Sequence, residues 1–420
     1  MKHAGRRSAA TPTSPTSARR RGTRRNKPVA RHTIAKVLIS SLLALGLVTG
    51  LGVAYLYDHF NGNLNIISVD GQLSNRPTAK TFEGPRSPIN ILVMGSDTRE
   101  GEGNDIDSEG GGGSDTTILM HLSADRRSAY GISVPRDTLV DRPECTALNG
   151  DTIPAQDGVL WNEAYNVGGA ACTIQQFEQL TGVLVDNYVV VDFTGFKSMV
   201  DAVGGVEICV PEEIDDAKTG LTLQPGTQTI KGDDALNYVR LRYSIGDGSD
   251  IGRIKRQQAF VAAMASKVVS GGVLGRPDRL LNFVGAVTKS LTTDLGNLLD
   301  IAQVGGQFQG VGLKRIQFVT VPFEYSTEDP GRVVMTAEAD ALWDKVINDA
   351  PLGKLRAGSI SAGAVPGAEP SGSASTGPGP SGSPSSSPTD DVTEEPGDGA
   401  TTSPSAEAEA EDLASVGLCT

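Results

Sequence analysis

Short apolar runs alternate with amphipathic segments between residues 88 and 352. Runs rich in β-branched and aromatic residues are typical of strands, and apolar residues spaced three or four apart are typical of helices. We therefore expect strands at residues 64–69, 89–94, 117–122, 129–134, 186–193, 206–210 and 316–321, and helices at 173–180, 194–203, 251–269, 298–308 and 336–347. This alternation predicts one α/β (α+β) domain at residues 88–352, with three layers and a central mixed sheet flanked by helices.

The N-terminal pattern is different. Residues 1–36 contain 11 Lys and Arg and no acidic residue, and residues 37–56 contain no charge at all. Twenty helical residues, at about 1.5 Å each, span a ~30 Å hydrocarbon core. We expect a basic cytoplasmic segment at 1–36, one transmembrane anchor at 37–57 and an extracellular stalk at 58–87. A cleaved signal peptide is the competing interpretation, but no small-x-small cleavage site follows the apolar run closely.

The C-terminal residues 353–420 are dominated by Ser, Pro, Gly, Ala and acidic residues. Such a composition buries too little apolar surface to offset its ordering entropy, so we expect a disordered tail. A spacer across the cell wall and a solubilising tail both remain open as its function.

Nucleic acid is not expected as a partner. The basic N-terminal segment could bind it in isolation, but this segment directly precedes the predicted anchor, and the body that follows is acidic. The chain has 37 basic and 50 acidic residues, a net charge of -13. Without the 11 basic residues of the N-terminal segment, 26 basic residues face 50 acidic ones, a balance of -24. A nucleic-acid-binding domain needs a basic footprint, which this body lacks.

Four cysteines follow the predicted anchor, in a compartment where thiols oxidise: Cys145, Cys172, Cys209 and Cys419. Two disulfides are expected, and three pairings are formally open. We prefer Cys172 with Cys209, which leaves Cys145 with Cys419.

Two aspartates mark a candidate metal site. Asp97 ends a predicted strand and Asp115 precedes another, so neighbouring strands place both carboxylates at one rim of the sheet. Mg²⁺ is commonly held by one or two carboxylates and completes its shell with water and phosphate oxygens. We expect Mg²⁺ here, with Mn²⁺ as the alternative. Taken singly, each aspartate is more typical of a turn or a helix cap.

Arginines gather in three short motifs. Arg136 follows a strand and a proline, Arg240 and Arg242 share one side of an extended backbone, and a helix puts Arg253, Arg256 and Gln257 on one face. Guanidinium groups bind phosphate oxygens bidentately and stay charged, which suits a diphosphate clamp. Surface salt bridges are the alternative for each arginine alone.

The motifs in their order resemble the LytR-CpsA-Psr family, most closely an actinobacterial member. The resemblance covers about residues 88–270. The matching segments are 90–99 (NILVMGSDTR), 114–116 (SDT), 133–137 (SVPRD), 162–169 (NEAYNVGG), 180–196 (LTGVLVDNYVVVDFTGF), 201–207 (DAVGGVE), 235–242 (ALNYVRLR) and 250–258 (DIGRIKRQQ).

The resemblance implies a membrane-anchored ligase with an extracellular catalytic domain. Such an enzyme moves a glycopolymer from a polyprenyl diphosphate carrier to peptidoglycan as a phosphodiester and releases polyprenyl phosphate. By motif matching, Asp97 and Asp115 carry Mg²⁺, while Arg136, Arg240, Arg242, Arg253 and Gln257 hold the diphosphate. Arg99, Asp137 and Arg256 also match, with less defined roles. Asp97 and Asp137 are candidates for accepting the sugar hydroxyl's proton, and the lipid is expected in an apolar cavity between sheet and helices.

Two positions depart from the family pattern. Gly113 stands where the family often has Arg, and Leu160 where it often has Lys. Both changes remove a cation near the phosphates. Two other functions therefore stay open: a polyprenyl diphosphate hydrolase with water as acceptor, and a non-catalytic lipid-binding or regulatory envelope protein. The sequence does not identify the polymer, whether teichoic acid, capsule or arabinogalactan.

Overall fold

The computed structural model describes residues 31–97, 113–242, 245, 248–269, 273, 276–356 and 358–365 of the chain. The chain forms two units, Met1–Leu56 and Tyr57–Thr420. Helix α1 (Arg31–Asn61) is long and apolar enough over Thr33–Asn61 to cross a membrane. Most of the predicted basic segment, residue Arg99 and the tail after residue 365 lie outside the described residues.

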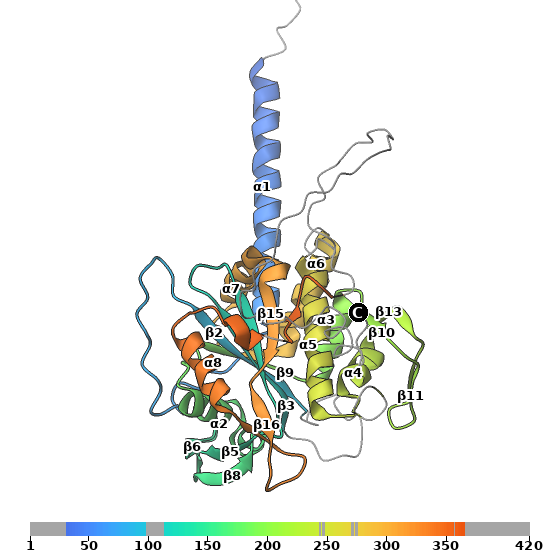
Figure 1. The fold of residues 1–420 in the computed structure, drawn as a ribbon. Helices are drawn as coiled ribbons and strands as arrows, with labels where there is room; N and C mark the ends of the chain where they lie inside the picture. The colour runs from blue at the N-terminus through green and yellow to red at the C-terminus, as the bar shows by residue number, and fades with distance from the viewer. Residues whose placement is uncertain are drawn as a thin grey trace, which may run out of the picture. The chain divides into compact units, whose positions relative to one another are not determined.

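The second unit is built on an eight-stranded mixed sheet (Figure 1). Neighbouring strands pair in parallel in β1/β14, β2/β9 and β4/β15, and antiparallel elsewhere. In spatial order the strands are β1 (Asn65–Ile66), β14 (Leu291–Thr293), β9 (Asn187–Val191), β2 (Ile89–Ser96), β3 (Ser114–Leu122), β4 (Ala129–Val134), β15 (Ile316–Thr320) and β18 (Ile360–Ser361). The predicted mixed sheet is confirmed.

Helices cover both faces of this sheet. Successive side chains of a strand point to opposite faces, so Leu119 packs in one core and Met120 against the other. One face carries α2 (Glu163–Thr181) and α8 (Ala337–Ile347), whose Phe177 and Trp343 meet edge-on at 5.5 Å. The other face carries α3 (Phe193–Ala202), α4 (Gly232–Arg240) and α5 (Asp250–Lys267), which share the second core. The three-layer prediction is therefore confirmed.

The N-terminus of α5 shows how local sequence positions the site. Ser249 is extended and its side chain accepts a hydrogen bond from the Gly252 N–H, the expected cap for an orphan helix donor. Because Ser249 is the cap, Asp250 is free of that task and turns its carboxylate to neighbouring arginines. The predicted helix at 251–269 is confirmed to within two residues.

Two helices were not predicted, α4 and α6 (Pro277–Ser290). The end of α4 contains Tyr238 and Val239, residue types that favour strands. Tertiary packing overrides that propensity, because Ala235, Leu236 and Val239 are all buried at helical spacing. The extended backbone predicted at Arg240 is wrong, since Arg240 is the last residue of α4.

The other elements lie outside the central sheet or connect its parts. Helix α7 (Leu298–Val311) precedes β15. Two-stranded pairs are β5 (Leu139–Arg142) with β8 (Gln156–Leu160), β6 (Cys145–Thr146) with β7 (Thr152–Ile153), β10 (Val206–Val210) with β13 (Gly226–Ile230), β11 (Ile214–Asp216) with β12 (Leu221–Leu223), and β16 (Phe323–Tyr325) with β17 (Val333–Met335), and the 3₁₀ turns are η2 (Leu313–Arg315) and η3 (Gly353–Arg356).

The tail prediction is wrong for its first residues. Residues 358–365 include β18, which pairs with β15, and Ile360, Ala362 and Val365 are buried in the core. Strand β18 pairs along the edge of β15, and burial of these apolar side chains in the core offsets the Gly- and Ser-rich composition around them. Residues 366–420 lie outside the described residues.

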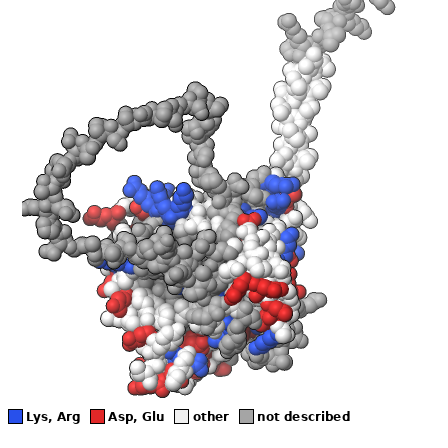
Figure 2. All heavy atoms as spheres, turned by 45° about the vertical axis from the view of Figure 1, so that its right-hand side comes forward, with Lys and Arg blue, Asp and Glu red and all other residues white. Residues whose placement is uncertain are grey.

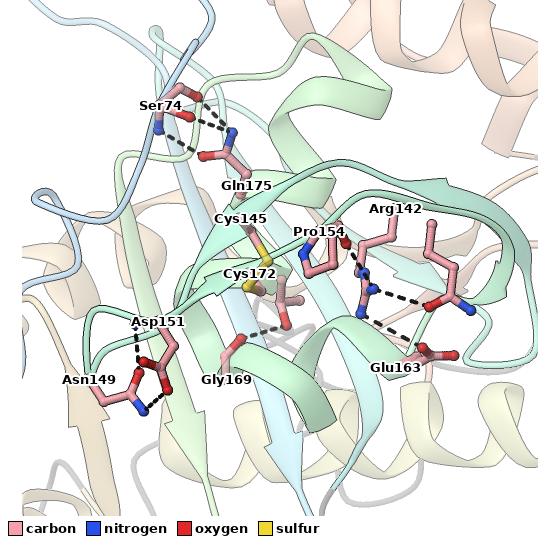
Figure 3. Close-up of a disulfide and its surroundings, with 12 residues drawn as sticks. Ser74, Arg142, Cys145, Asn149, Asp151, Pro154, Glu163, Gly169, Cys172 and Gln175 are labelled. Atoms are coloured by element: carbon pink, nitrogen blue, oxygen red, sulfur yellow. Dashed lines mark hydrogen bonds and ion pairs between the residues drawn. A yellow bond between two sulfur atoms is a disulfide. The ribbon is translucent and has the colours of Figure 1, made fainter.

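The preferred disulfide pairing is wrong. Cys145 on β6 is bonded to Cys172 on α2, with their Cα atoms 5.3 Å apart, so neither Cys172–Cys209 nor Cys145–Cys419 forms (Figure 3). Cys209 is disulfide-bonded too, and Cys419 lies outside the described residues. The pairing depends on the β5–β8 and β6–β7 hairpins, which fold back over α2, and no local pattern in the sequence announces that contact.

Replacing both Cys145 and Cys172 with alanine should lower the free energy of unfolding by about 3.5 kcal/mol, because a loop of 27 residues is no longer closed in the unfolded chain. Urea denaturation of the two proteins measures the difference. A Glu144→Gln variant, changed at an exposed position of the same hairpin, should match wild type. A loss below 1 kcal/mol in the double variant would contradict the expectation.

Candidate active site

A cavity of about 310 Å³ lies between the sheet and helices α3, α4 and α5. Most of its wall is apolar and includes Met120 from β3, Phe196 and Met199 from α3, and Val261 and Met264 from α5. Polar and charged side chains line it as well: Ser96, Asp115, Thr116, Asp192, Arg240, Arg253 and Gln257. The cavity therefore offers an apolar volume for a hydrocarbon chain and cationic groups for an anion, which is the predicted combination.

Asp115 belongs to the charged lining of the cavity, and Arg136, which is not part of the lining, binds its carboxylate. Asp115 lies at the start of β3 and Arg136 lies two residues after the end of β4, so antiparallel pairing brings the two side chains together. The Arg136 guanidinium donates to the Asp115 carboxylate and also lies 3.6 Å from Asp250 Oδ1 and 3.7 Å from Asp137 Oδ2. One guanidinium thus connects three carboxylates from three separate segments.

Asp250 is the second hub, a role that its place in the 250–258 motif did not predict. Its Oδ1 lies 2.5 Å from Arg253, 3.3 Å from Arg242 and 3.6 Å from Arg136. The Asp250 Oδ2 atom is buried and has no hydrogen-bond partner among the described residues. The spacing of Asp250 and Arg253, three residues apart on a helix, was the available signal for this pair.

Burial and charge act in opposite directions on the Asp115 carboxyl. Burial alone raises its pKa, but the positive charges of Arg136, Arg253 and Arg240 outweigh burial and hold the pKa below its ordinary value. Burial lowers the pKa of Arg253 to about 10, despite the charge of Asp250, and neighbouring Arg136 adds to the decrease. Asp115 is therefore ionised and Arg253 charged at neutral pH.

An Asp115→Asn variant tests this electrostatic balance through pH. Because the folded-state pKa of Asp115 is lowered, the stability from its ionisation is complete above the unfolded-state pKa of about 4 and is lost as pH falls through the folded-state value. Wild type should therefore lose more stability than the variant as pH falls below about 4. Urea denaturation at a series of pH values measures this. Parallel curves for the two proteins would refute the lowered pKa, and Glu144→Gln serves as the exposed control.

Asp97 lies at the same rim of the sheet as Asp115, as predicted. The Asp97 N–H donates to the Gly113 carbonyl at 3.0 Å, and the Gly113 N–H donates to Asp97 Oδ1 at 2.6 Å. Among the described residues no group of three or more His, Cys, Asp and Glu side chains could hold a metal. Two carboxylates fit Mg²⁺, which accepts one or two from protein and takes its other oxygens from phosphate and water.

The predicted arginines divide into two groups. Arg240, Arg253 and Gln257 line the cavity, and the Arg240 guanidinium lies 4.7 Å from the centre of the Phe193 ring. Gln257 is fixed by two hydrogen bonds: its Nε2 donates to the Val239 carbonyl at 3.1 Å and its Oε1 accepts from Thr116 at 3.2 Å. These side chains come from α4 and α5 and meet only in the folded chain.

Arg242 and Arg256 do not line the cavity. Arg242 lies beside Asp137 and Asp250, at 3.6 and 3.3 Å, so it does not share the surroundings of Arg240. Arg256 is fully buried and donates to the Leu241 carbonyl at 2.6 Å, which fastens the chain after α4. We predicted that Arg253, Arg256 and Gln257 share one helix face. Arg253 and Gln257 do line the cavity together, but the prediction is wrong for Arg256, which points into the core.

Asp137 is anchored by a residue that no motif indicated. Arg332, between β16 and β17, donates to Asp137 Oδ1 at 2.7 Å. Arg332 lies 195 residues along the chain from Asp137, so only the fold reveals the pair. Tyr165, in the first turn of α2, is hydrogen-bonded to Ser96, and burial raises its pKa. Its place in the NEAY motif was the sequence signal that was overlooked.

The two departures from the family pattern have different surroundings. A Cβ atom on Gly113 would lie 3.2 Å from Asn166 Oδ1, so a larger residue here must displace that amide. Leu160 ends β8, is half-buried and pairs with Leu139, close in sequence to Asp137. Neither Gly113 nor Leu160 supplies the cation that the family often has at these positions. Arg332 supplies a different cation, which lies beside Asp137.

Comparison with known proteins agrees with this arrangement. The sequence model of the LytR_cpsA_psr family matches residues 59–347, more than half of the chain. The chain belongs to this family. The resemblance seen in the motifs is thereby confirmed, and the match extends beyond residues 88–270 at both ends.

Several named cell-wall proteins are similar in sequence to this chain. The cell wall biosynthesis protein LcpA of Corynebacterium glutamicum is 30% identical over 342 residues, which cover 74% of this chain and 64% of LcpA. The polyisoprenyl-teichoic acid–peptidoglycan teichoic acid transferase TagV of Bacillus subtilis is 29% identical over 258 residues, 60% of this chain and 62% of TagV. The chain thus spans slightly less than two-thirds of the length of both relatives.

Solved structures share the fold. Protein gbs0355 of Streptococcus agalactiae has a TM-score of 0.52 and 24% identity, over 64% of this chain and 90% of that one. The crystal structure of B. subtilis TagV has a TM-score of 0.50 and 22% identity, over 64% of this chain and all of that one.

Proposed function

We propose that this protein is a phosphotransferase that moves a glycopolymer from a polyprenyl diphosphate carrier to peptidoglycan. The observation that carries the proposal is the cavity, in which an apolar wall meets Arg240, Arg253, Gln257 and Asp115. A prenyl chain fits the apolar part, and the diphosphate meets the guanidiniums. TagV is named for the transfer of teichoic acid from a polyisoprenyl carrier to peptidoglycan, which supports the same reaction class.

The proposed step is an in-line displacement at phosphorus. An acceptor hydroxyl oxygen attacks the phosphorus that carries the glycopolymer, and a new P–O bond forms. The bond from this phosphorus to the bridging oxygen breaks, and polyprenyl phosphate leaves with the electron pair. The hydroxyl proton passes to a carboxylate. Asp97 is favoured over Asp137, because Asp97 directly follows Ser96 in the cavity lining whereas Asp137 is held by Arg332.

The arginines supply most of what this step needs. Phosphoryl transfer depends on alignment and on stabilising negative charge rather than on covalent chemistry by the protein. Arg240 and Arg253 face the cavity, and Arg136 holds Asp115 in place beside them. Bound at Asp97 and Asp115, Mg²⁺ would add positive charge at the diphosphate oxygens.

We place the catalytic unit outside the cell membrane, with α1 as a single-pass anchor and the N-terminus in the cytoplasm. The apolar stretch of α1 and the 11 basic residues before it support this orientation, because positive residues are retained on the cytoplasmic side. The polymer, peptidoglycan and the membrane are then the partners, all accessible on the outer side.

The test uses the full-length protein in detergent with Mg²⁺, a polyprenyl diphosphate oligosaccharide and peptidoglycan fragments. Release of polyprenyl phosphate with a matching sugar phosphate gained by the acceptor is the expected result. Release without a change in acceptor mass identifies a hydrolase. No release despite measurable lipid binding identifies a non-catalytic protein, and omission of divalent metal reports on the cation requirement.

A further inference from the structure

Helices α6 and α7 keep most of their side chains at least partly exposed, although Phe283 of α6 and Phe308 of α7 pack against the core. Each has 14 residues, and each has only one buried side chain among them, Thr288 in α6 and Val311 in α7. Leu281 on α6 and Leu299 on α7 are 40% and 56% exposed. Helix α7 is apolar along most of its length and contains one charge, Asp300. Helices of this kind are usually covered on a second side.

Phe60 and Asn61, the first part of the second unit, contact these two helices. Phe60 packs on α6, where a Cβ atom on Gly285 would lie 3.3 Å from its ring, and the Asn61 side chain accepts from the Leu298 N–H of α7 at 3.0 Å. The chain is then fastened to β14, between the two helices, by pairing of Asn65 with Thr292.

The distance along the chain from membrane to body is very short. The first charged residue after the apolar stretch is Asp58, and Asn61 follows three residues later in the same helix. Three helical residues rise about 4.5 Å, less than the headgroup layer of roughly 5–8 Å on each side of a bilayer. A contact made by Phe60 and Asn61 therefore brings α6 and α7 to the level of the lipid headgroups.

The charge of this region is opposite to that of the rest of the body. Residues 276–315 contain five basic residues (Arg276, Arg279, Lys289, Lys314 and Arg315) against three acidic ones (Asp278, Asp294 and Asp300). This stretch is positive by two, whereas the other residues between 37 and 365 include 21 basic and 37 acidic ones, a balance of -16. Figure 2 shows groups of basic side chains at the upper rim of the body, the end at which α6 and α7 lie in Figure 1, with some acidic side chains among them and mostly acidic ones farther down.

We propose that α6 and α7 form a docking face that rests on the anionic outer surface of the membrane, with Leu281 and Leu299 inserted at headgroup level. The proposal rests on the proposed anchoring by α1 and extends it from the anchor to the body. Apolar side chains flanked by basic ones are the pattern that binds membrane interfaces. Helix α6 packs closely on α3, where a Cβ atom on Gly195 would lie 2.6 Å from Ser290 Cβ. Docking therefore holds the α3 wall of the cavity beside the bilayer that contains the carrier lipid.

The experiment uses the full-length chain in phosphatidylcholine vesicles with and without about one-third phosphatidylglycerol. Single cysteines replace Leu281 or Leu299 and are labelled with a polarity-sensitive fluorophore, and unsubstituted protein gives the background. Leu148→Cys, 44% exposed on the disulfide-bonded hairpins, is the matched control. Quenching by lipids with a nitroxide headgroup should be about twofold stronger or more at 281 and 299 than at 148, and stronger with phosphatidylglycerol.

Flotation of the same samples separates the two levels of the inference. Protein that floats with the vesicles but is quenched equally at 281, 299 and 148 is anchored without docking, which overturns the proposal. Protein that does not float overturns both anchoring and docking. Replacing Arg276 and Lys289 with glutamate should remove the phosphatidylglycerol dependence while flotation persists, and an unchanged dependence would also contradict the proposal.

Discussion

Replacing Arg136 with alanine should lower polymer transfer by about 10³-fold, the scale of losing a guanidinium that organises charge in phosphoryl transfer. Arg136 contacts Asp115, Asp137 and Asp250. Burial alone would lower the pKa of Arg136, but the negative charges of these three carboxylates outweigh burial and raise it. Without Arg136 the carboxylates repel one another and the diphosphate at the cavity. The release of polyprenyl phosphate per unit time measures the loss.

Two further variants separate catalysis from stability in that experiment. Removing one partner of a buried ion pair costs about 3–5 kcal/mol, so unfolding in urea must be followed alongside activity. Arg136→Lys keeps the charge but loses the planar fork, and should retain more stability than activity. Arg127→Ala, at a side chain that is 80% exposed, should behave like wild type. Near-normal transfer by a folded Arg136→Ala protein would refute the clamp.

Replacing Met264 with tryptophan should raise KM for a long-chain carrier by about 15-fold, because the larger ring excludes two or so methylene groups worth about 0.8 kcal/mol each. Met264 lies in the apolar wall of the cavity, on the helix that also presents Arg253 and Gln257. A water-soluble diphosphate with a short chain should bind both proteins equally, since its head meets the unchanged arginines.

The conservative variant Met264→Leu keeps the volume of the wall and should leave KM within about threefold of wild type, as volume-conserving apolar changes usually cost little. Binding of short-chain and long-chain carriers by calorimetry provides the comparison independently of turnover. An equal loss for both chain lengths in Met264→Trp would show that the prenyl chain does not occupy this cavity.

Much of the fold is local enough to be predicted. The buried runs that form β2, β3, β4, β9 and β15 are short, apolar and rich in β-branched residues, and each became a strand. Helix α5 was predicted at residues 251–269 and begins directly after the Ser249 cap. Helix α4 was not predicted, because the residues at its end favour a strand. Burial of Ala235 and Leu236 in the core stabilises the helix instead.

The candidate site was predicted as a set of residues, and the structure supplied their neighbours. Asp115, Arg136, Arg240, Arg253 and Gln257 were all named from motifs, and four of them line the cavity while Arg136 holds Asp115. The hub role of Asp250 and the pair between Asp137 and Arg332 were missed. Both depend on contacts between segments far apart in the chain.

The sequence by itself determined the family, the mixed α/β class, the apolar span near the N-terminus and the residue types of the candidate site, since these follow from residues at short spacing. Only the tertiary structure decided the Cys145–Cys172 pairing, the burial of Arg256, the docking of Ile360 on the sheet edge and the position of α6 and α7 beside Phe60. Periodicity reports which face of an element is apolar, but it does not report what that face packs against. The packing partner of each apolar face is fixed only when the whole chain folds and buries its apolar surface together.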